Sequence, residues 1–178
     1  MRSCIDMLAV QGWASATVAA VAERAGVSRG AAQHHFPTRE ALITAALQQM
    51  FDDLTAGVSS TMTSAPPNDV RTVVERAVEI YTGTEFKAAL QVWAAAASDP
   101  VLREQILPME AKFARAAHQL TVHALDPEGK SDNAYRLAQV TLDLARGLGL
   151  ADTLSDDSAR RAQVIETWAE QLDAALNR

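Results

Sequence analysis

Residue types that define several common protein classes are scarce in this chain of 178 residues. Its single cysteine, Cys4, excludes an intramolecular disulfide and a cysteine-based zinc site. No apolar run approaches the ~18 residues of a membrane span, and the first residues lack the long apolar core of a secretion signal. We therefore expect a soluble, cytoplasmic protein without membrane contacts, in which Cys4 is a small buried hydrophobe.

Aromatic residues are also few, at 5%, although 48% of the residues are hydrophobic. Alanine supplies much of the apolar content, and it is the best helix former and a poor strand former. Five of the six prolines lie beside polar or turn-forming residues, where they mark the ends of helices. The composition therefore predicts an all-α fold.

An excess of basic residues is missing as well, since the net charge is −6. Residues 1–50 hold four arginines against three acidic residues, whereas the rest holds 12 basic and 19 acidic residues. The N-terminal part is thus slightly basic and the remainder is acidic. This asymmetry fits a small DNA-reading head on a body that does not touch DNA.

Turn-forming and capping residues divide the N-terminal part into short helices. Gly12 is a candidate C-cap for the first helix, while Thr17 and Ser28 are candidate N-caps for the second and third. Pro37 follows the third helix, and Thr38 starts a longer fourth one. The expected helices span about residues 1–11, 17–25 and 28–36, and the fourth runs from 38 to a linker-like loop at Ser59–Asn68.

Five further helices are expected in the body. Asp99 and Pro100 suit the N-cap and first helical position of one of them, and Pro108 should kink or split it. A polar loop follows at 127–132. The expected body helices span about residues 69–82, 85–97, 99–125, 133–152 and 157–177.

The most informative segment is residues 17–39, TVAAVAERAGVSRGAAQHHFPTR. Two short helices joined by a turn at Gly26, with Ala22, Val27 and Ala32 at inward positions, predict a helix-turn-helix. Gln can pair bidentately with adenine and Arg with guanine. The outward residues of the second of these helices are Arg29, Gly30, Ala31, Gln33, His34 and His35.

The same segment resembles the TetR family of regulators. The resemblance rests on Ala-Gly-Val-Ser at 25–28, Arg-Gly at 29–30, His-Phe at 35–36 and Arg-Glu-x-Leu at 39–42. It is specific over about the first 47 residues and looser beyond them. It implies a DNA-binding domain at 1–47 and a helical ligand-binding and dimerisation domain at 48–178.

The resemblance also implies roles for individual residues. Thr17 and Ser28 would contact phosphate, Arg29 to Ala31 with His34 would face the groove, and His35 with Arg39 would grip the DNA backbone. The implied function is a repressor that binds operator DNA as a homodimer and is released by a small apolar ligand, with no cofactor and no metal. The full set of expected DNA-binding residues is Thr17, Ser28, Arg29, Gly30, Ala31, Gln33, His34, His35, Thr38 and Arg39.

Two features depart from the family pattern. Gln33 stands where the family usually has a tyrosine that contacts phosphate, so this position becomes a candidate base reader. The first helix is about a turn short and lacks the usual basic arm. We expect a start inside a longer reading frame, the alternative being DNA binding with fewer minor-groove contacts.

Body residues suggest a ligand site and a dimer seam, each weighed against ordinary core packing. The larger side chains of two helices, with His118 or Gln91 as a polar contact, can line an apolar cavity; His118 can equally be a partly buried packing residue. Apolar residues form one stripe on each of the last two expected helices, and these stripes can pack into the core of the body, against a second copy of the chain, or both. The expected ligand residues are Phe86, Leu90, Trp93, Met109, Phe113 and His118; the expected seam is Leu137, Val140, Thr141, Leu144, Leu148, Ile165, Trp168 and Leu172.

Other functions have weaker support. His34 and His35 point about 100° apart on a helix, which suits a metal poorly. The chain lacks a nucleophile elbow and a phosphate-binding glycine loop, which argues against an enzyme. An interaction or sensor protein that has lost DNA binding remains an alternative, against which the intact 25–39 run argues.

Overall fold

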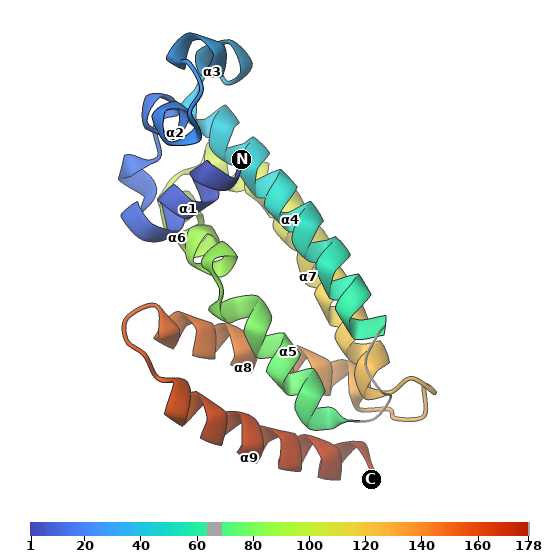
Figure 1. Ribbon diagram of the computed structural model, residues 1–178. Coiled ribbons are helices and arrows are strands. Elements are labelled where there is room, and N and C mark those ends of the chain that lie inside the picture. The colour runs from blue at the N-terminus through green and yellow to red at the C-terminus, as the bar shows by residue number, and fades with distance from the viewer. Residues whose placement is uncertain (64–68, 178) are drawn as a thin grey trace. The chain divides into compact units, whose positions relative to one another are not determined.

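The computed structural model describes residues 1–63 and 69–177, the side chains of 58–63 excepted. Every regular element in this part of the chain is a helix, which confirms the all-α prediction (Figure 1). None of the described helices is long and apolar enough to cross a bilayer. The chain divides into two compact units, Met1–Leu54 with Thr84–Phe113 and Thr55–Gly83 with Ala114–Arg178. The expected functional boundary near residue 47 stays a prediction.

The first unit contains the N-terminal helices, the whole of α6 and the first parts of α4 and α7. α4 and α7 each begin in this unit, which includes them as far as Leu54 and Phe113. Its elements are α1 (Arg2–Gln11), the 3-10 turn η1 (Trp13–Ser15), α2 (Val18–Ala25), α3 (Arg29–His35), the start of α4 (Arg39–Thr63), α6 (Thr84–Ser98) and the start of α7 (Pro100–Leu125).

α1 packs along α6 in this unit. Cys4 and Leu8 on α1 are fully buried, and burial of a leucine side chain contributes about 1.5–3 kcal/mol. Burial also raises the pKa of the Cys4 thiol to about 11, so the residue is a neutral hydrophobe as expected. Gly12 ends α1 at φ +79°, a left-handed conformation that few residues other than glycine adopt.

α4 and α7 lie side by side in the first unit. The rings of Phe51 on α4 and Phe113 on α7 pack 5.5 Å apart. At the solvent edge, Lys112 Nζ lies 2.9 Å from a carboxylate oxygen of Asp52, and this hydrogen bond lowers the pKa of Asp52. The contact is exposed, so the buried aromatic pair is the stronger part of the packing.

The second unit is built around three helices, α5 (Val70–Thr82), α8 (Ala134–Asp152) and α9 (Ser158–Leu176). α5 packs against both α8 and α9, and Figure 1 shows α8 and α9 as neighbouring helices that follow each other in the chain. One apolar stripe of α5 is buried in this unit: Val73, Val74, Ala77, Val78 and Tyr81.

An ion-pair cluster closes the connection between α8 and α9. Arg161 donates to Asp152 at 2.7 Å and to Asp157 at 2.9 Å, and all three side chains are less than one-fifth exposed. Burial strengthens such charge-assisted bonds relative to surface pairs. The cluster therefore fixes α9 against the end of α8.

Most predicted helix boundaries are confirmed to within two residues, but three details are wrong or missed. α4 continues through Thr63, so the expected loop at Ser59–Asn68 is wrong for 59–63, and 64–68 lie outside the described residues. Serine and threonine cost a helix only a few tenths of a kcal/mol each, which does not stop it. Pro108 does not split α7, which runs on as one helix, and η1 was not foreseen.

Candidate DNA-binding site

Two capped helices form the predicted helix-turn-helix. The hydroxyl of Thr17 accepts a hydrogen bond from the backbone N–H of Ala20 at 3.2 Å, which caps α2. Ser28 accepts in the same way from Ala31 at 3.2 Å and caps α3. Each cap satisfies a backbone donor that the first turn of a helix leaves free. The N-cap predictions for both helices are therefore confirmed.

The turn between α2 and α3 depends on Gly26. This residue has φ +69°, in the left-handed region, and its N–H bonds to the end of α2. A β-carbon at Gly26 would meet nothing within 4 Å, so the backbone conformation and not lack of space requires the glycine. The predicted inward position of Val27 is wrong, because its side chain is 51% exposed. Only its backbone N–H is directed inward, where it donates to the carbonyl of Ala22.

α3 presents one open face and one packed face. Ala32 and Phe36 are half-buried, on the side of the helix that packs against the unit. The other side is exposed, and it consists of the residues expected to face DNA: Arg29, Gly30, Ala31, Gln33, His34 and His35. The structure therefore brings these six side chains together on one exposed surface, which we call the reader face.

The reader face has donors that no other part of the described chain uses. Within residues 1–63 and 69–177, Arg29 makes no ion pair, and the His34 and His35 rings meet edge to face at 5.6 Å. No group of three metal-ligating side chains is found among the described residues. The face offers one guanidinium, one carboxamide and two imidazoles to a partner, which is the donor set for base edges and phosphates.

Gly30 stands in the first turn of α3, where a β-carbon would meet nothing within 4 Å. Glycine costs a helix about 1 kcal/mol relative to alanine. The described chain therefore offers no packing reason for a glycine at this position.

Thr38 and Arg39 lie at the start of α4, and the structure gives them different environments. Thr38 is exposed, and its hydroxyl accepts from the N–H of Ala41 at 3.1 Å, so it caps α4. Arg39 is half-buried, and its guanidinium donates to the carbonyl oxygens of Ala16, at 3.2 Å, and of Trp13. The Arg39 guanidinium is thus directed at the protein itself, whereas the side chains of the reader face are directed at solvent.

The expected ligand residues fall into separate groups in the structure. The ring of Phe86, which is buried, meets that of half-buried Trp93 edge to face at 5.8 Å, and Leu90 lies between them on α6. Met109 and Phe113 are buried on α7, where Phe113 packs on Phe51. These five belong to the first unit.

The two polar candidates for the ligand site have partners inside the chain. His118, in the second unit, has its Nε2 3.0 Å from the backbone carbonyl of Tyr135, and it packs on the Tyr135 ring. Gln91 Oε1 accepts a hydrogen bond from the N–H of Trp13 at 3.3 Å. A ligand that used either group would have to replace these contacts, so the ligand assignment stays a prediction.

The expected dimer seam divides between the interior and the surface of the second unit. Thr141, Leu148, Ile165 and Leu172 are buried in the unit's own core. The others remain accessible: Val140 is 48% exposed, and Leu137, Leu144 and Trp168 are half-buried.

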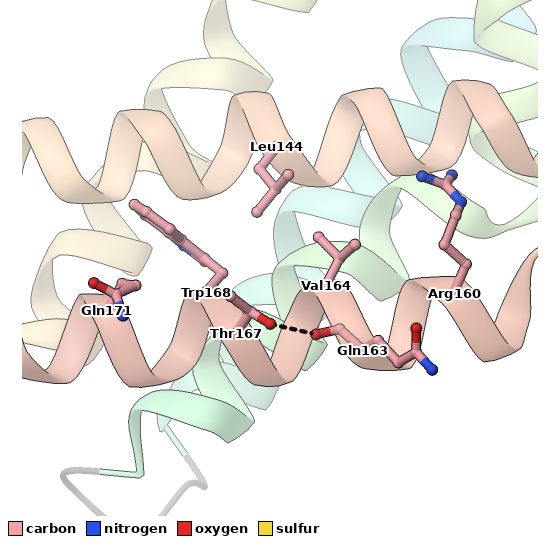
Figure 2. Close-up of a pocket in the computed structure, with 7 residues that line it drawn as sticks. All are labelled: Leu144, Arg160, Gln163, Val164, Thr167, Trp168 and Gln171. Atoms are coloured by element: carbon pink, nitrogen blue, oxygen red, sulfur yellow. Dashed lines mark hydrogen bonds between the residues drawn. The ribbon is translucent and has the colours of Figure 1, made fainter.

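An open groove of about 350 Å³ lies on this accessible side (Figure 2). In Figure 2, Leu144 of α8 points toward α9, and Val164 and Trp168 of α9 point toward α8. Sequence reasoning missed Val164, although its spacing of four residues from Trp168 places both on one helix face. The remaining residues that line the groove are Arg160, Gln163, Thr167 and Gln171.

Comparison with known proteins agrees with this geometry. Residues 5–46 match the model of the bacterial regulatory proteins of the tetR family. The HTH-type transcriptional regulator CymR of Pseudomonas putida is 27% identical over 173 residues, which cover 96% of this chain and 85% of CymR. The chain belongs to the TetR family. It is accordingly a DNA-binding transcriptional regulator and not an enzyme.

Solved structures of transcriptional regulators share the whole fold. The crystal structure of a transcriptional regulator from Rhodococcus sp. Rha1 is 25% identical, with a TM-score of 0.68, and the match covers 99% of this chain and 91% of that one. A regulator from Saccharomonospora viridis in complex with choline has a TM-score of 0.71 at 17% identity, covering 99% and 93%. The latter likeness concerns the fold alone. The shared fold therefore extends beyond the 5–46 segment to the body.

Proposed function

We propose that this TetR-family protein is a cytoplasmic, homodimeric repressor that a small apolar molecule releases from operator DNA. The observation that carries the proposal is the reader face, an exposed helix surface with unused donors in a capped helix-turn-helix. A bacterial protein that reads DNA acts in the cytoplasm, where the chromosome lies, and this supports the cytoplasmic assignment.

Sequence recognition is assigned to the reader face. Arg29 and Gln33 are its long hydrogen-bonding side chains, and they suit guanine and adenine respectively. Thr17, Ser28 and Thr38 are exposed hydroxyls at helix starts, which suit phosphate oxygens. Gly30 and Ala31 leave the helix surface low enough to approach the groove floor, and His34 and His35 extend the face toward the backbone.

Dimerisation is assigned to the accessible side of α8 and α9. A single helix-turn-helix reads few base pairs, so specific binding requires two heads at a fixed spacing. Val140, Leu144, Val164 and Trp168 leave apolar surface there, around the groove shown in Figure 2. A second copy of the same face would cover this surface by a two-fold axis.

Release by a ligand is assigned to the body. The Saccharomonospora viridis regulator, which shares this fold, was crystallised in complex with choline. We assign the site in this chain to the surroundings of Phe86, Leu90 and Trp93, with Met109, Phe113 and His118 as further candidates. The ligand must favour the form that does not bind DNA, and a coupling of about 1–3 kcal/mol gives a 5–150-fold change in affinity.

A binding experiment with DNA tests the proposal. The purified protein is titrated against duplexes from its own upstream region and against random duplexes of the same length at one salt concentration. The repressor proposal expects a strong preference for an upstream duplex, and transcription from it should fall when the protein is added. Equal, weak binding to every duplex would support instead the alternative of an interaction protein that has lost DNA recognition.

A further inference from the structure

Arg39 joins the two ends of the helix-turn-helix. Its Nε donates to the carbonyl of Ala16 at 3.2 Å, and a terminal nitrogen donates to the carbonyl of Trp13. Its guanidinium carbon also lies 4.2 Å from the centre of the Trp13 ring. Ala16 directly precedes Thr17, the cap of α2, while Arg39 is the first residue of α4, which follows α3. These contacts therefore close the whole segment 17–38 into a loop.

A second contact holds the same turn from the other side. Gln91 on α6 accepts from the N–H of Trp13 at 3.3 Å. Its Oε1 would lie only 3.2 Å from a β-carbon at Gly12, so the turn and α6 are in close approach. Trp13 is thus held at its carbonyl and ring by Arg39 and at its amide by Gln91.

These observations favour an internal role for Arg39. A guanidinium has five N–H donors in a fixed plane, and here two of its nitrogens and one face are directed at the chain. Lysine cannot reproduce this combination, because its ammonium has neither the fork nor the stacking plane. A phosphate contact alone would accept either residue.

We propose that Arg39 is a positioning residue, which fixes α2 and α3 for DNA binding by clamping the Trp13–Ala16 turn, and that it is not chiefly a phosphate contact. The inference rests on the proposed operator binding and explains how α2 and α3 are held in position in the free protein. A reader fixed in advance loses less conformational freedom on binding.

Salt dependence separates positioning from phosphate contact. Each lost phosphate contact lowers the slope of log K against log salt by about 0.9, whereas a loss of prior order lowers affinity equally at all salt concentrations. Arg39→Lys, Arg39→Ala and Trp13→Leu are compared with the wild type on a duplex selected from a random library and on an unselected duplex. Arg29→Ala is the matched control, because Arg29 is an exposed arginine of the same reader without an ion pair among the described residues.

The clamp predicts that Arg39→Lys is as defective as Arg39→Ala, by roughly tenfold to a hundredfold as expected for lost charge-assisted bonds, with the wild-type salt slope. Trp13→Leu should weaken binding less, and its effect should not add to that of Arg39→Ala. A near-normal Arg39→Lys, or a slope that falls by about 0.9 in Arg39→Ala, would overturn the clamp.

Hydrogen exchange gives a readout that does not require DNA. The clamp predicts faster exchange of the amides in 17–38 for Arg39→Lys, with α8 and α9 unchanged. Unchanged exchange in 17–38 would contradict the clamp even if DNA binding were lost. If the wild type itself binds no DNA selectively, the proposed operator binding fails, while this comparison still decides whether the clamp exists.

Discussion

The indole Nε1 of Trp168 on α9 donates a hydrogen bond of 3.0 Å to the hydroxyl of Thr141 on α8. Thr141 is buried, and its hydroxyl donates a hydrogen bond of 2.8 Å to the carbonyl oxygen of Leu137. The indole is thus bonded to a group in the interior of the unit. Trp168 is therefore oriented by a buried partner while part of its ring stays accessible in the groove between α8 and α9. An oriented aromatic side chain is well suited to the centre of an interface.

The first prediction concerns the dimer. Val140→Glu places a carboxylate on the accessible apolar side of α8, and two-fold symmetry would bring charges into an interface that excludes water. We expect the wild type to sediment with twice the mass of the chain and the variant as a folded monomer.

Val101→Glu is the control for this experiment, because Val101 is 66% exposed on α7, in the other unit. It should leave the dimer intact. A Val140→Glu protein that remains dimeric would move the interface away from this face.

The second prediction concerns Gly30. Gly30→Ala should stabilise α3 by about 1 kcal/mol, because alanine is the better helix former and its methyl group has free space. The same methyl group would stand between α3 and the groove, so DNA binding should weaken.

Gly57→Ala serves as the matched change, since a β-carbon at Gly57 on α4 also meets nothing within 4 Å. Denaturant unfolding and DNA titration are measured for both variants. The proposal would be contradicted if Gly30→Ala bound DNA as well as Gly57→Ala does.

The predicted helices show what this sequence reveals by itself. Thr17, Ser28 and Asp99 cap helices as expected, because capping needs only a short side chain and its own next turn. Thr38, which was expected to start α4, caps that helix in the same way. The reader face was equally accessible to prediction, since it depends on helix periodicity within seven residues.

Contacts between distant segments were not predictable in this way. Arg39 was expected to face DNA, and its contacts with Trp13 and Ala16 span 26 and 23 residues. Thr141 and Trp168 both belonged to the expected dimer stripe, but packing against α5 decides which of the eight residues are buried. Helix periodicity defines a face, and only tertiary packing decides what covers it.

The third prediction concerns the ligand. Trp93 is half-buried and touches Phe86, so Trp93→Ala should leave DNA binding intact and abolish the response to an inducing molecule. Binding is measured with and without the inducer found by screening. If the variant instead loses ~3–5 kcal/mol of unfolding free energy, as a core aromatic would, Trp93 is part of the scaffold and the ligand site lies elsewhere.

The fourth prediction concerns acid stability. Asp126 accepts from the backbone N–H groups of Ser131 at 2.8 Å and Lys130 at 2.9 Å, and these bonds lower the pKa of its carboxyl. A group with a lowered pKa stabilises the fold above its ordinary pKa of about 3.9, and that contribution is lost as the pH falls through the lower folded value.

Asp126→Asn should therefore be less stable than the wild type at neutral pH, and the difference should shrink as the pH falls below about 4. Asp132→Asn, an exposed carboxylate of the same loop, is the control and should be neutral at both pH values. A stability difference for Asp126→Asn that did not change with pH would contradict this role of the carboxylate.

Base discrimination by Gln33 tests the central claim, that α3 reads DNA sequence, most directly. The measurement is the ratio of the dissociation constants for a random and a selected duplex, for the wild type and for Gln33→Ala. Loss of a bidentate contact to one base should reduce the ratio about 5–150-fold, which corresponds to ~1–3 kcal/mol of discrimination, with binding to random DNA nearly unchanged. An equal loss of affinity for both duplexes, with the ratio preserved, would show that Gln33 does not read a base and would contradict the account of the reader face.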